Sequence, residues 1–147
     1  MARFLPDTSC IIPTFDESHT HHEAATAEID RRLARGDALI VAAPVLVEVY
    51  SVLTRLPLPQ RFSPAEAWRL IESNFLGHGI EVVALDAAAY LQLVSSAPRE
   101  GTAGGRIYDA VIVACARAAQ VDTILTFNDR QFRPLAAGTI EVVVPSV

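Results

Sequence analysis

Five short apolar segments alternate along the chain with longer stretches in which apolar residues recur at helical spacing. The five segments cover residues 3–7, 38–42, 80–85, 123–127 and 140–144. Apolar strands separated by helical stretches are typical of a parallel sheet that is covered on both faces. Pro6 has no N–H to donate within a central strand, so we place it at the end of the first strand. The pattern predicts an α/β fold with a parallel sheet of about five strands.

The stretches between the strands carry signals for helix starts and stops. We expect helices over residues 22–35, 44–56, 64–76, 87–97 and 106–119. Proline in the first turn marks two starts, and glycine marks two ends. We find no linker, internal repeat or low-complexity tract, so residues 1–147 are predicted to form a single domain.

Two of these helices contain a carboxylate within an otherwise apolar run. Glu48 interrupts residues 45–53, and Asp109 interrupts residues 107–116. Helices that are apolar nearly all round are expected to be buried. Because a buried carboxylate costs several kcal/mol unless it has a partner, we expect a cation or strong hydrogen bonds beside each acid.

Two further acids follow strand-like segments, where sites form in open α/β sheets. Asp7 follows the first such segment and Asp129 the fourth. Oxygen ligands of this kind suit Mg²⁺ or Mn²⁺. The alternative is that the acids are unrelated turn, surface and helix-terminus residues. Asn128 competes with Asp129 for the fourth position.

Composition narrows the function further. The chain has 51% hydrophobic residues, a formal net charge of −5 and no lysine, which excludes lysine-dependent phosphate chemistry. The negative charge argues against nucleic-acid binding by charge alone, so a nuclease would need its arginines gathered on one face. The two cysteines are predicted to be small core residues in a reducing compartment. Without a signal peptide or a membrane-spanning segment, we expect a cytoplasmic protein.

Two other motifs invite a binding site and are better explained as loops. His19, His21 and His22 lack the spacing of a common zinc site, so a polar loop leading into a helix is expected. The loop at residues 101–105 precedes a helix but is followed by no Lys-Ser/Thr pair, so it is not a P-loop.

Four motifs together resemble the PIN-domain nucleases, most closely the VapC-type toxins of bacterial toxin–antitoxin pairs. They are Asp-Thr-Ser after the first strand, Glu48 between valines, Arg-Ile-Tyr-Asp-Ala opening a late helix, and Thr-Phe-Asn-Asp-Arg-Gln-Phe after the fourth strand. Each motif is short, but their order and spacing at this chain length are fairly specific. The resemblance implies a three-layer α/β/α sandwich and Mg²⁺- or Mn²⁺-dependent cleavage of single-stranded or looped RNA. It also implies a homodimer that is inhibited by a cognate antitoxin.

The resemblance also assigns roles to residues. Asp7, Glu48 and Asp109 match the three most regular acids of the family, and Asn128 or Asp129 matches the fourth. Thr8 matches a hydroxyl residue beside the first acid, and Thr126 matches the Thr or Ser that ends the fourth strand. Three arginines lie near the acids in sequence and are candidates for RNA contact or for balancing the acids: Arg106, Arg130 and Arg133.

Two rival functions stay open at this point. A PIN-like scaffold can bind RNA or a partner without cleaving, although intact acids count against this. A metal-dependent phosphatase is the other, although Ser9 stands where Asp-x-Asp phosphatases have their second acid. For the antitoxin, we expect a groove between helices 44–56 and 64–76, with apolar surface from Val49, Val52, Trp68 and Phe75.

Overall fold

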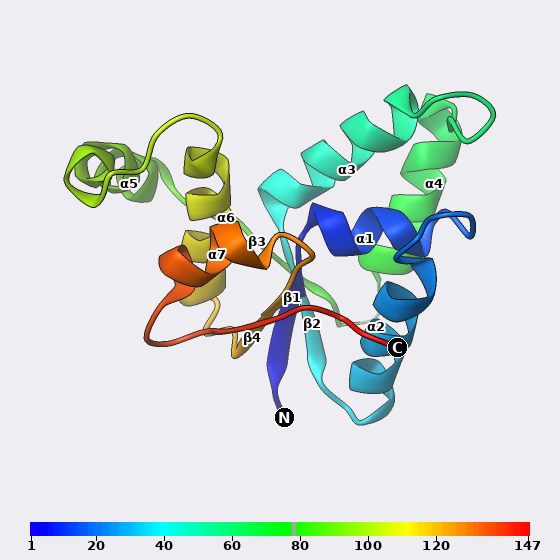
Figure 1. Ribbon diagram of the computed structural model, residues 1–147, viewed down its shortest axis with the longest axis horizontal. Coiled ribbons are helices and arrows are strands. Elements are labelled where there is room, and N and C mark those ends of the chain that lie inside the picture. Colours follow the sequence, from blue (N-terminus) through cyan, green and yellow to red (C-terminus); the bar gives the residue numbers. More distant parts are fainter. Residues whose placement is uncertain (78) are drawn as a thin grey trace.

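The computed structural model describes residues 1–77 and 79–147, and a five-stranded parallel sheet lies at its centre (Figure 1). Its strands are β1 (Arg3–Pro6), β2 (Ala38–Ala42), β3 (Glu81–Val83), β4 (Thr123–Leu125) and β5 (Glu141–Val143), in the spatial order β3-β2-β1-β4-β5. Every strand falls within a segment predicted from the sequence. Pro6 ends β1 opposite Leu125, as expected for a residue that cannot continue the ladder.

Helices cover both faces of the sheet, which confirms the three-layer sandwich. Figure 1 shows α1 to α4 on one side of the sheet and α5 to α7 on the other. The helices are α1 (Thr8–Thr14), α2 (His22–Ala34), α3 (Ala43–Arg55), α4 (Pro64–Phe75), α5 (Ala87–Glu100), α6 (Arg106–Ala118) and α7 (Asp129–Ala136).

The two shortest helices, α1 and α7, were not predicted from the sequence. Each has a proline inside it, Pro13 in α1 and Pro134 in α7. A proline within a helical pattern is normally a stop signal, so it conceals a helix of only two turns. Both helices position site residues, because Asp7 is the N-cap of α1 and Asp129 is the first residue of α7.

The helix ends elsewhere follow the expected chemistry. Ser63 caps α4 in a reciprocal capping box with Glu66, and Asp86 caps α5 by accepting from the N–H of Ala89 at 2.8 Å. Helix α5 runs past its predicted end to Glu100. It stops at Gly101, whose φ of 69° is readily adopted only by glycine.

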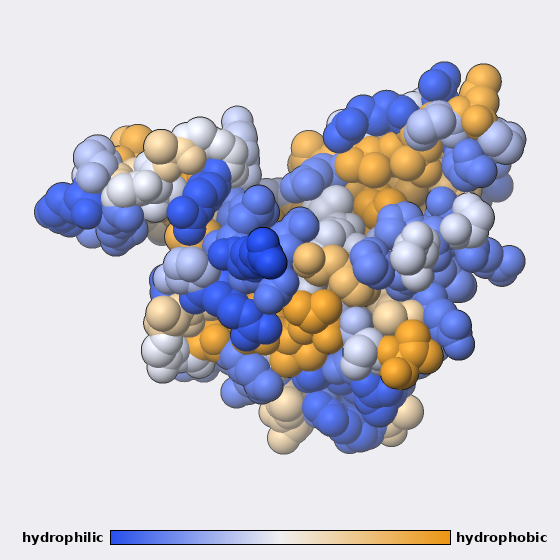
Figure 2. Space-filling model, in the orientation of Figure 1, coloured by the Kyte–Doolittle hydropathy of each residue, from blue (hydrophilic) through white to orange (hydrophobic). Residues whose placement is uncertain are grey.

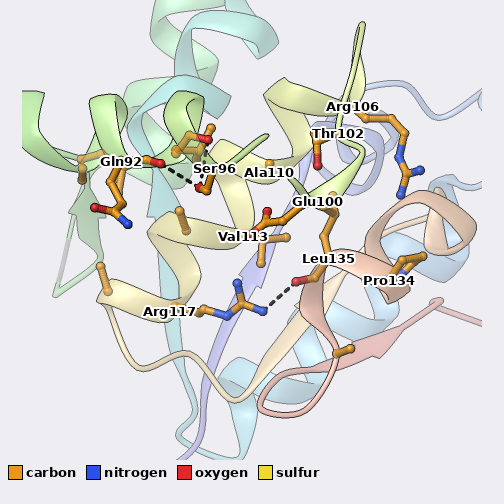
Figure 3. A pocket seen from close by; sticks show the side chains of 16 residues that line it. Gln92, Ser96, Glu100, Thr102, Arg106, Ala110, Val113, Arg117, Pro134 and Leu135 are labelled. Carbon is orange, nitrogen blue, oxygen red and sulfur yellow. Dashed lines mark hydrogen bonds between the residues drawn. The ribbon is translucent and has the colours of Figure 1, made fainter. Parts of the chain in front are cut away.

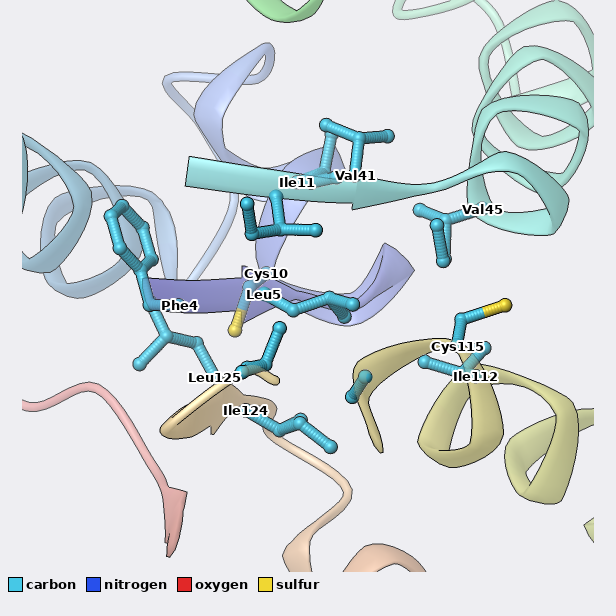
Figure 4. Close-up of a cluster of buried hydrophobic side chains, with 14 of the residues drawn as sticks. Phe4, Leu5, Cys10, Ile11, Val41, Val45, Ile112, Cys115, Ile124 and Leu125 are labelled. Atoms are coloured by element: carbon cyan, nitrogen blue, oxygen red, sulfur yellow. The ribbon is translucent and has the colours of Figure 1, made fainter. Parts of the chain in front are cut away.

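The hydrophobic core lies between the sheet and the helices on each face (Figure 4). Phe4 and Leu5 of β1 are completely buried, since β1 is the central strand. Cys10 and Cys115 are free thiols within this core, as the sequence predicted. Burying each large apolar side chain contributes about 1.5–3 kcal/mol, and this packing holds the strand ends in place.

Helix α5 projects from the body of the protein (Figure 1). Its apolar residues Leu91 and Val94 are 72% and 60% exposed. The space-filling view in Figure 2 shows a hollow between this projecting arm and the arm formed by α3 and α4. In the described part of the chain, none of the helices is long and apolar enough to cross a membrane.

Candidate active site

Asp7 lies at the end of β1 and is the N-cap of α1, buried at the carboxyl edge of the sheet. Its Oδ1 accepts hydrogen bonds from the Ser9 hydroxyl at 2.6 Å and from the N–H of Cys10 at 3.2 Å. Its Oδ2 accepts from the Thr126 hydroxyl at 2.7 Å. Both carboxylate oxygens are therefore held in fixed directions.

The two hydroxyls that hold Asp7 are themselves fixed by backbone donors after β4. The N–H of Phe127 donates to Ser9 Oγ at 2.9 Å, and the N–H of Asn128 donates to Thr126 Oγ1 at 2.9 Å. Thr126 was predicted from the family resemblance. Sequence reasoning gave Ser9 no role. Ser9 lies two residues after Asp7, which caps α1, and next to the loop after β4, so its hydroxyl can bind both the Asp7 carboxylate and the N–H of Phe127.

Burial raises the pKa of Asp7 to about 6, although hydrogen bonds from Ser9, Thr126 and Cys10 act in the opposite direction. The charge of Asp109 adds to the increase. Burial also raises the pKa of Asp109, helped by the charge of Glu48 and opposed by that of Arg106. Asp109 is thus close enough to Asp7 and to Glu48 for their negative charges to repel.

Asp109 and Glu48 face an open groove of about 1030 Å³ between α3, α5 and α6. Asp109 is in the first turn of α6, as predicted, but it is only partly buried. Glu48 is exposed, so the prediction that it is buried is wrong. The outward face of α3 borders the groove and does not pack on the core. Its apolar residue Val47 is therefore 72% exposed.

Asp129, the candidate for the fourth acid, interacts with an arginine of its own helix. Asp129 begins α7 and accepts from Arg133 Nε at 3.1 Å, one helical turn away. Asn128 is the exposed N-cap of α7 and meets the site through its backbone N–H to Thr126. The choice between Asn128 and Asp129 therefore stays a prediction.

The candidate arginines differ in their surroundings. Arg133 balances Asp129, and the charge of Arg106 acts on Asp109, so both neutralise acids as one of our alternatives expected. Arg130 is exposed on α7. Arg106 also lines a second cavity of about 660 Å³ between α5, α6 and α7 (Figure 3). There Arg117 donates to the Leu135 carbonyl at 2.7 Å, and the four predicted acids lie outside the lining of this cavity.

Within the described residues, the predicted acids are not gathered into one metal-binding group. Among residues 1–77 and 79–147, no three His, Cys, Asp or Glu side chains lie together as a metal-binding group. Beside Asp7, however, the buried Thr8 hydroxyl has no hydrogen-bond partner within the described chain. An unpartnered buried hydroxyl costs about 1–3 kcal/mol, so a further oxygen beside it would be favourable. This oxygen-only set fits a hard divalent cation, which would draw the repelling carboxylates together.

The histidine-rich segment forms the polar loop predicted from its sequence. It connects α1 to α2, and His22 is the first residue of α2. His22 Nδ1 lies 2.7 Å from the Pro13 carbonyl, and the ring of His21 stacks on Phe127. The residues therefore fold onto α1 and the loop after β4.

Two of the four apolar residues that we expected to line an antitoxin groove between α3 and α4 are buried. Val49 and Phe75 are 1% and 5% exposed, because they pack into the core. Val52 is half-buried, and Trp68 alone of the four is half-exposed. The apolar surface lies on the other side of α3, in the groove that contains Glu48 and Asp109.

Comparison with known proteins agrees with this architecture. Residues 4–137 match the model of the PIN domain family. Ribonuclease VapC40 of Mycobacterium tuberculosis is 40% identical over 118 residues, which is 78% of each chain. The crystal structure of Mycobacterium tuberculosis VapC20, a Sarcin-Ricin loop cleaving toxin, has a TM-score of 0.68 at 20% identity and covers 95% of this chain and 98% of its own. The DNA-bound VapBC from Salmonella typhimurium has a TM-score of 0.67 at 20% identity over 98% of both chains. The chain belongs to the PIN domain family.

Proposed function

We propose that this protein is a Mg²⁺- or Mn²⁺-dependent endoribonuclease that acts as the toxin of a toxin–antitoxin pair. One observation carries the proposal: Asp7 is buried and rigidly held beside a second acid, Asp109, in a member of the PIN domain family. The similarity to ribonuclease VapC40 supports RNA as the substrate. An energetically unfavourable pair of acids is what a site for a divalent cation requires before the cation binds.

The chain's own residues divide the work as follows. Asp7 and Asp109 would hold the cation, and Glu48, which faces the same groove as Asp109, would be the third acid of its site. Ser9 and Thr126 fix the direction of the Asp7 carboxylate. Thr8 offers its unpartnered hydroxyl to a water or phosphate oxygen beside Asp7. Asp129, or Asn128 in its place, orients the attacking water.

A bound divalent cation would supply Lewis-acid chemistry, namely a water activated for in-line attack on the phosphodiester and stabilisation of charge on the leaving oxygen. Arg106, whose charge acts on Asp109, and Arg130, which is exposed on α7, would contact phosphates that flank the bond being cut. Because Arg106 already acts on Asp109, it also limits the repulsion between the acids before RNA binds.

The experiment is RNA cleavage by the purified, antitoxin-free protein. Cleavage should require Mg²⁺ or Mn²⁺ and stop with EDTA, and Asp7→Asn should abolish it while circular dichroism shows an unchanged fold. Binding of RNA without cleavage under any of these metals would instead identify an inactive binding module. Full cleavage in chelated buffer would rule out the role of the cation.

We also propose a homodimer, because the groove between α3 and α5 is bordered by apolar side chains that a monomer leaves in water. Val47, Leu91, Val94 and Tyr108 are each at least 60% exposed. Large exposed apolar patches mark interaction sites. A second copy that packs α5 into this groove would cover the patch and bring the two acidic sites close together.

The dimer is tested with one variant and one matched control. Leu91→Asp should convert the dimer to a monomer in size-exclusion chromatography with light scattering. Leu58→Asp replaces a leucine of similar exposure, 74%, in the connection between α3 and α4, and should leave the dimer intact. A dimer that persists in Leu91→Asp would place the interface elsewhere.

A cognate antitoxin completes the proposal, since VapC proteins are the relatives of this chain. The acidic edge favours an inhibitor that presents arginine, whose guanidinium can bridge two carboxylates. Replacing that arginine in the antitoxin should restore cleavage more than it weakens the complex.

A further inference from the structure

The loop between α1 and α2 is held in a defined shape by its own hydrogen bonds. Asp16 Oδ1 accepts from the N–H and the hydroxyl of Ser18, at 3.0 and 2.6 Å. The N–H of His21 donates to His19 Nδ1 at 3.0 Å, and His22 Nδ1 lies 2.7 Å from the Pro13 carbonyl. A loop held by these hydrogen bonds presents its side chains in one arrangement.

This loop places the imidazole of His21 on the phenyl ring of Phe127. The ring centroids are 3.9 Å apart and the planes differ by 9°, so the two rings are stacked face to face. Phe127 is partly buried and packs against the core, whereas His21 is exposed. The ring of His19 is tilted by 40° at 5.6 Å from His21, so it stands beside the stack and does not extend it.

The stack lies next to the acidic site. The N–H of Phe127 donates to Ser9 Oγ, and Ser9 Oγ donates to Asp7 Oδ1, so only two hydrogen bonds separate the base of the stack from the Asp7 carboxylate. Phe127 also stands between Thr126, which binds Asp7, and Asn128. A strand of RNA whose phosphate reaches Asp7 therefore has its neighbouring nucleotides within reach of His21.

The charge of the protein makes contacts with bases more important than contacts with phosphates. The formal net charge is −5, and the chain has no lysine. Five of its twelve arginines already form ion pairs with acids: Arg3, Arg31, Arg32, Arg35 and Arg133. Stacking on an aromatic ring needs no charge, and it is the usual way in which proteins bind unpaired RNA bases.

We propose that His21, supported by Phe127, is a stacking site for an unpaired nucleobase next to the phosphodiester that is cut. The inference rests on the proposed ribonuclease function and adds to it a means of selecting single-stranded RNA. A base within a duplex has both faces covered by its neighbours, so it cannot use this site. Stacking tolerates every base, and the site therefore selects for strandedness more than for sequence.

The first test is steady-state cleavage of a short single-stranded RNA by three variants. His21→Ala should raise KM at least about fivefold, which corresponds to about 1 kcal/mol of stacking, and leave kcat nearly unchanged. His21→Phe should restore KM, because it keeps the aromatic face and removes the imidazole nitrogens. Thr20→Ala is the control in the same loop, because Thr20 is exposed and has no part in the stack, and it should change KM little.

The second test uses the same RNA with 2-aminopurine at successive positions, bound to Asp7→Asn protein, which cannot cut it. Stacking on His21 should quench the fluorescence at a position beside the cleavage site, and His21→Ala should remove that quenching. Because only Arg106 and Arg130 are proposed to contact phosphates, the affinity should fall only weakly with salt.

The outcomes separate this inference from the function on which it rests. If the wild-type protein cuts no RNA with Mg²⁺ or Mn²⁺, the proposed function fails. If the wild type cuts RNA and His21→Ala keeps its KM and its quenching, the stacking site is wrong although the nuclease stands. A loss of kcat in His21→Ala that His21→Phe does not rescue would mean that the imidazole nitrogens of His21 act in the cleavage step, and the stacking proposal would be wrong. Weaker inhibition by the antitoxin with unchanged KM would assign the stack to the protein partner, which also overturns the proposal.

Discussion

Replacing Asp7 with asparagine should make the metal-free protein more stable at neutral pH. Burial raises the pKa of Asp7 in the folded protein to about 6 from its ordinary value of 3.8. Between these values the folded protein keeps the proton that the unfolded chain has lost. The stabilisation by the neutral carboxyl is therefore complete below about pH 4, and it is lost as the pH rises through about 6.

The size of the effect follows from this shift. A difference of about two pKa units corresponds to about 3 kcal/mol of lost stability at neutral pH. Asparagine carries no charge, but its amide cannot accept from both Ser9 and Thr126 as the carboxylate does. Losing one of those hydrogen bonds costs about 1 kcal/mol. The net gain of about 2 kcal/mol should raise Tm by about 4–8 °C in a domain of this size.

The assay is thermal unfolding with EDTA at neutral pH and again near pH 4. The advantage of Asp7→Asn should be present at neutral pH and absent near pH 4, where wild-type Asp7 is itself neutral. Asp86→Asn is the control, since Asp86 also caps a helix but is exposed, and its Tm should change little. Adding Mg²⁺ should raise the Tm of the wild type and not that of Asp7→Asn. A folded Asp7→Asn protein that melts below the wild type at neutral pH would refute the reasoning.

Three further predictions concern other acids. Asp109→Asn should abolish RNA cleavage while circular dichroism and Tm show an intact fold; cleavage near the wild-type rate would remove Asp109 from the site. Asp129→Ala should reduce turnover more than Asn128→Ala and be partly rescued by excess Mn²⁺, and a metal titration of both variants decides this. Glu28→Ala should destabilise the protein by about 3–5 kcal/mol in urea unfolding, because it leaves the buried Arg32 without its partner. A loss below about 1 kcal/mol would mean that Arg32 reaches water.

The positions of Asp7 and Thr126 could be predicted because they depend on the backbone. Each directly follows a short apolar strand, and neighbouring parallel strands bring their carboxyl ends to one edge of the sheet. The strand pattern therefore predicted this edge for Asp7, whereas Thr126 was named by the family resemblance. The hydrogen bonds of Ser9 depend on side-chain directions at the start of α1, a helix that Pro13 concealed, so they could not be predicted.

The surroundings of Glu48 could not be predicted for a different reason. A helix that is apolar on all sides has the same pattern whether its outer face packs into a core or is left exposed. Helix α3 does both, since Val49 packs inward and Val47 faces the groove. By contrast, the pairing of Asp129 with Arg133 follows from their spacing of four residues and could have been predicted.

The central position of β1 also determines when in its synthesis the protein becomes complete. β1 is made first, yet its Asp7 is held by Thr126, 119 residues later, through the pairing of β1 with β4. A chain that is still growing on the ribosome has its first acid but lacks the strand that positions it. The same holds for a chain truncated before β4. We therefore expect the proposed nuclease activity to appear only after β4 has been made and has paired with β1.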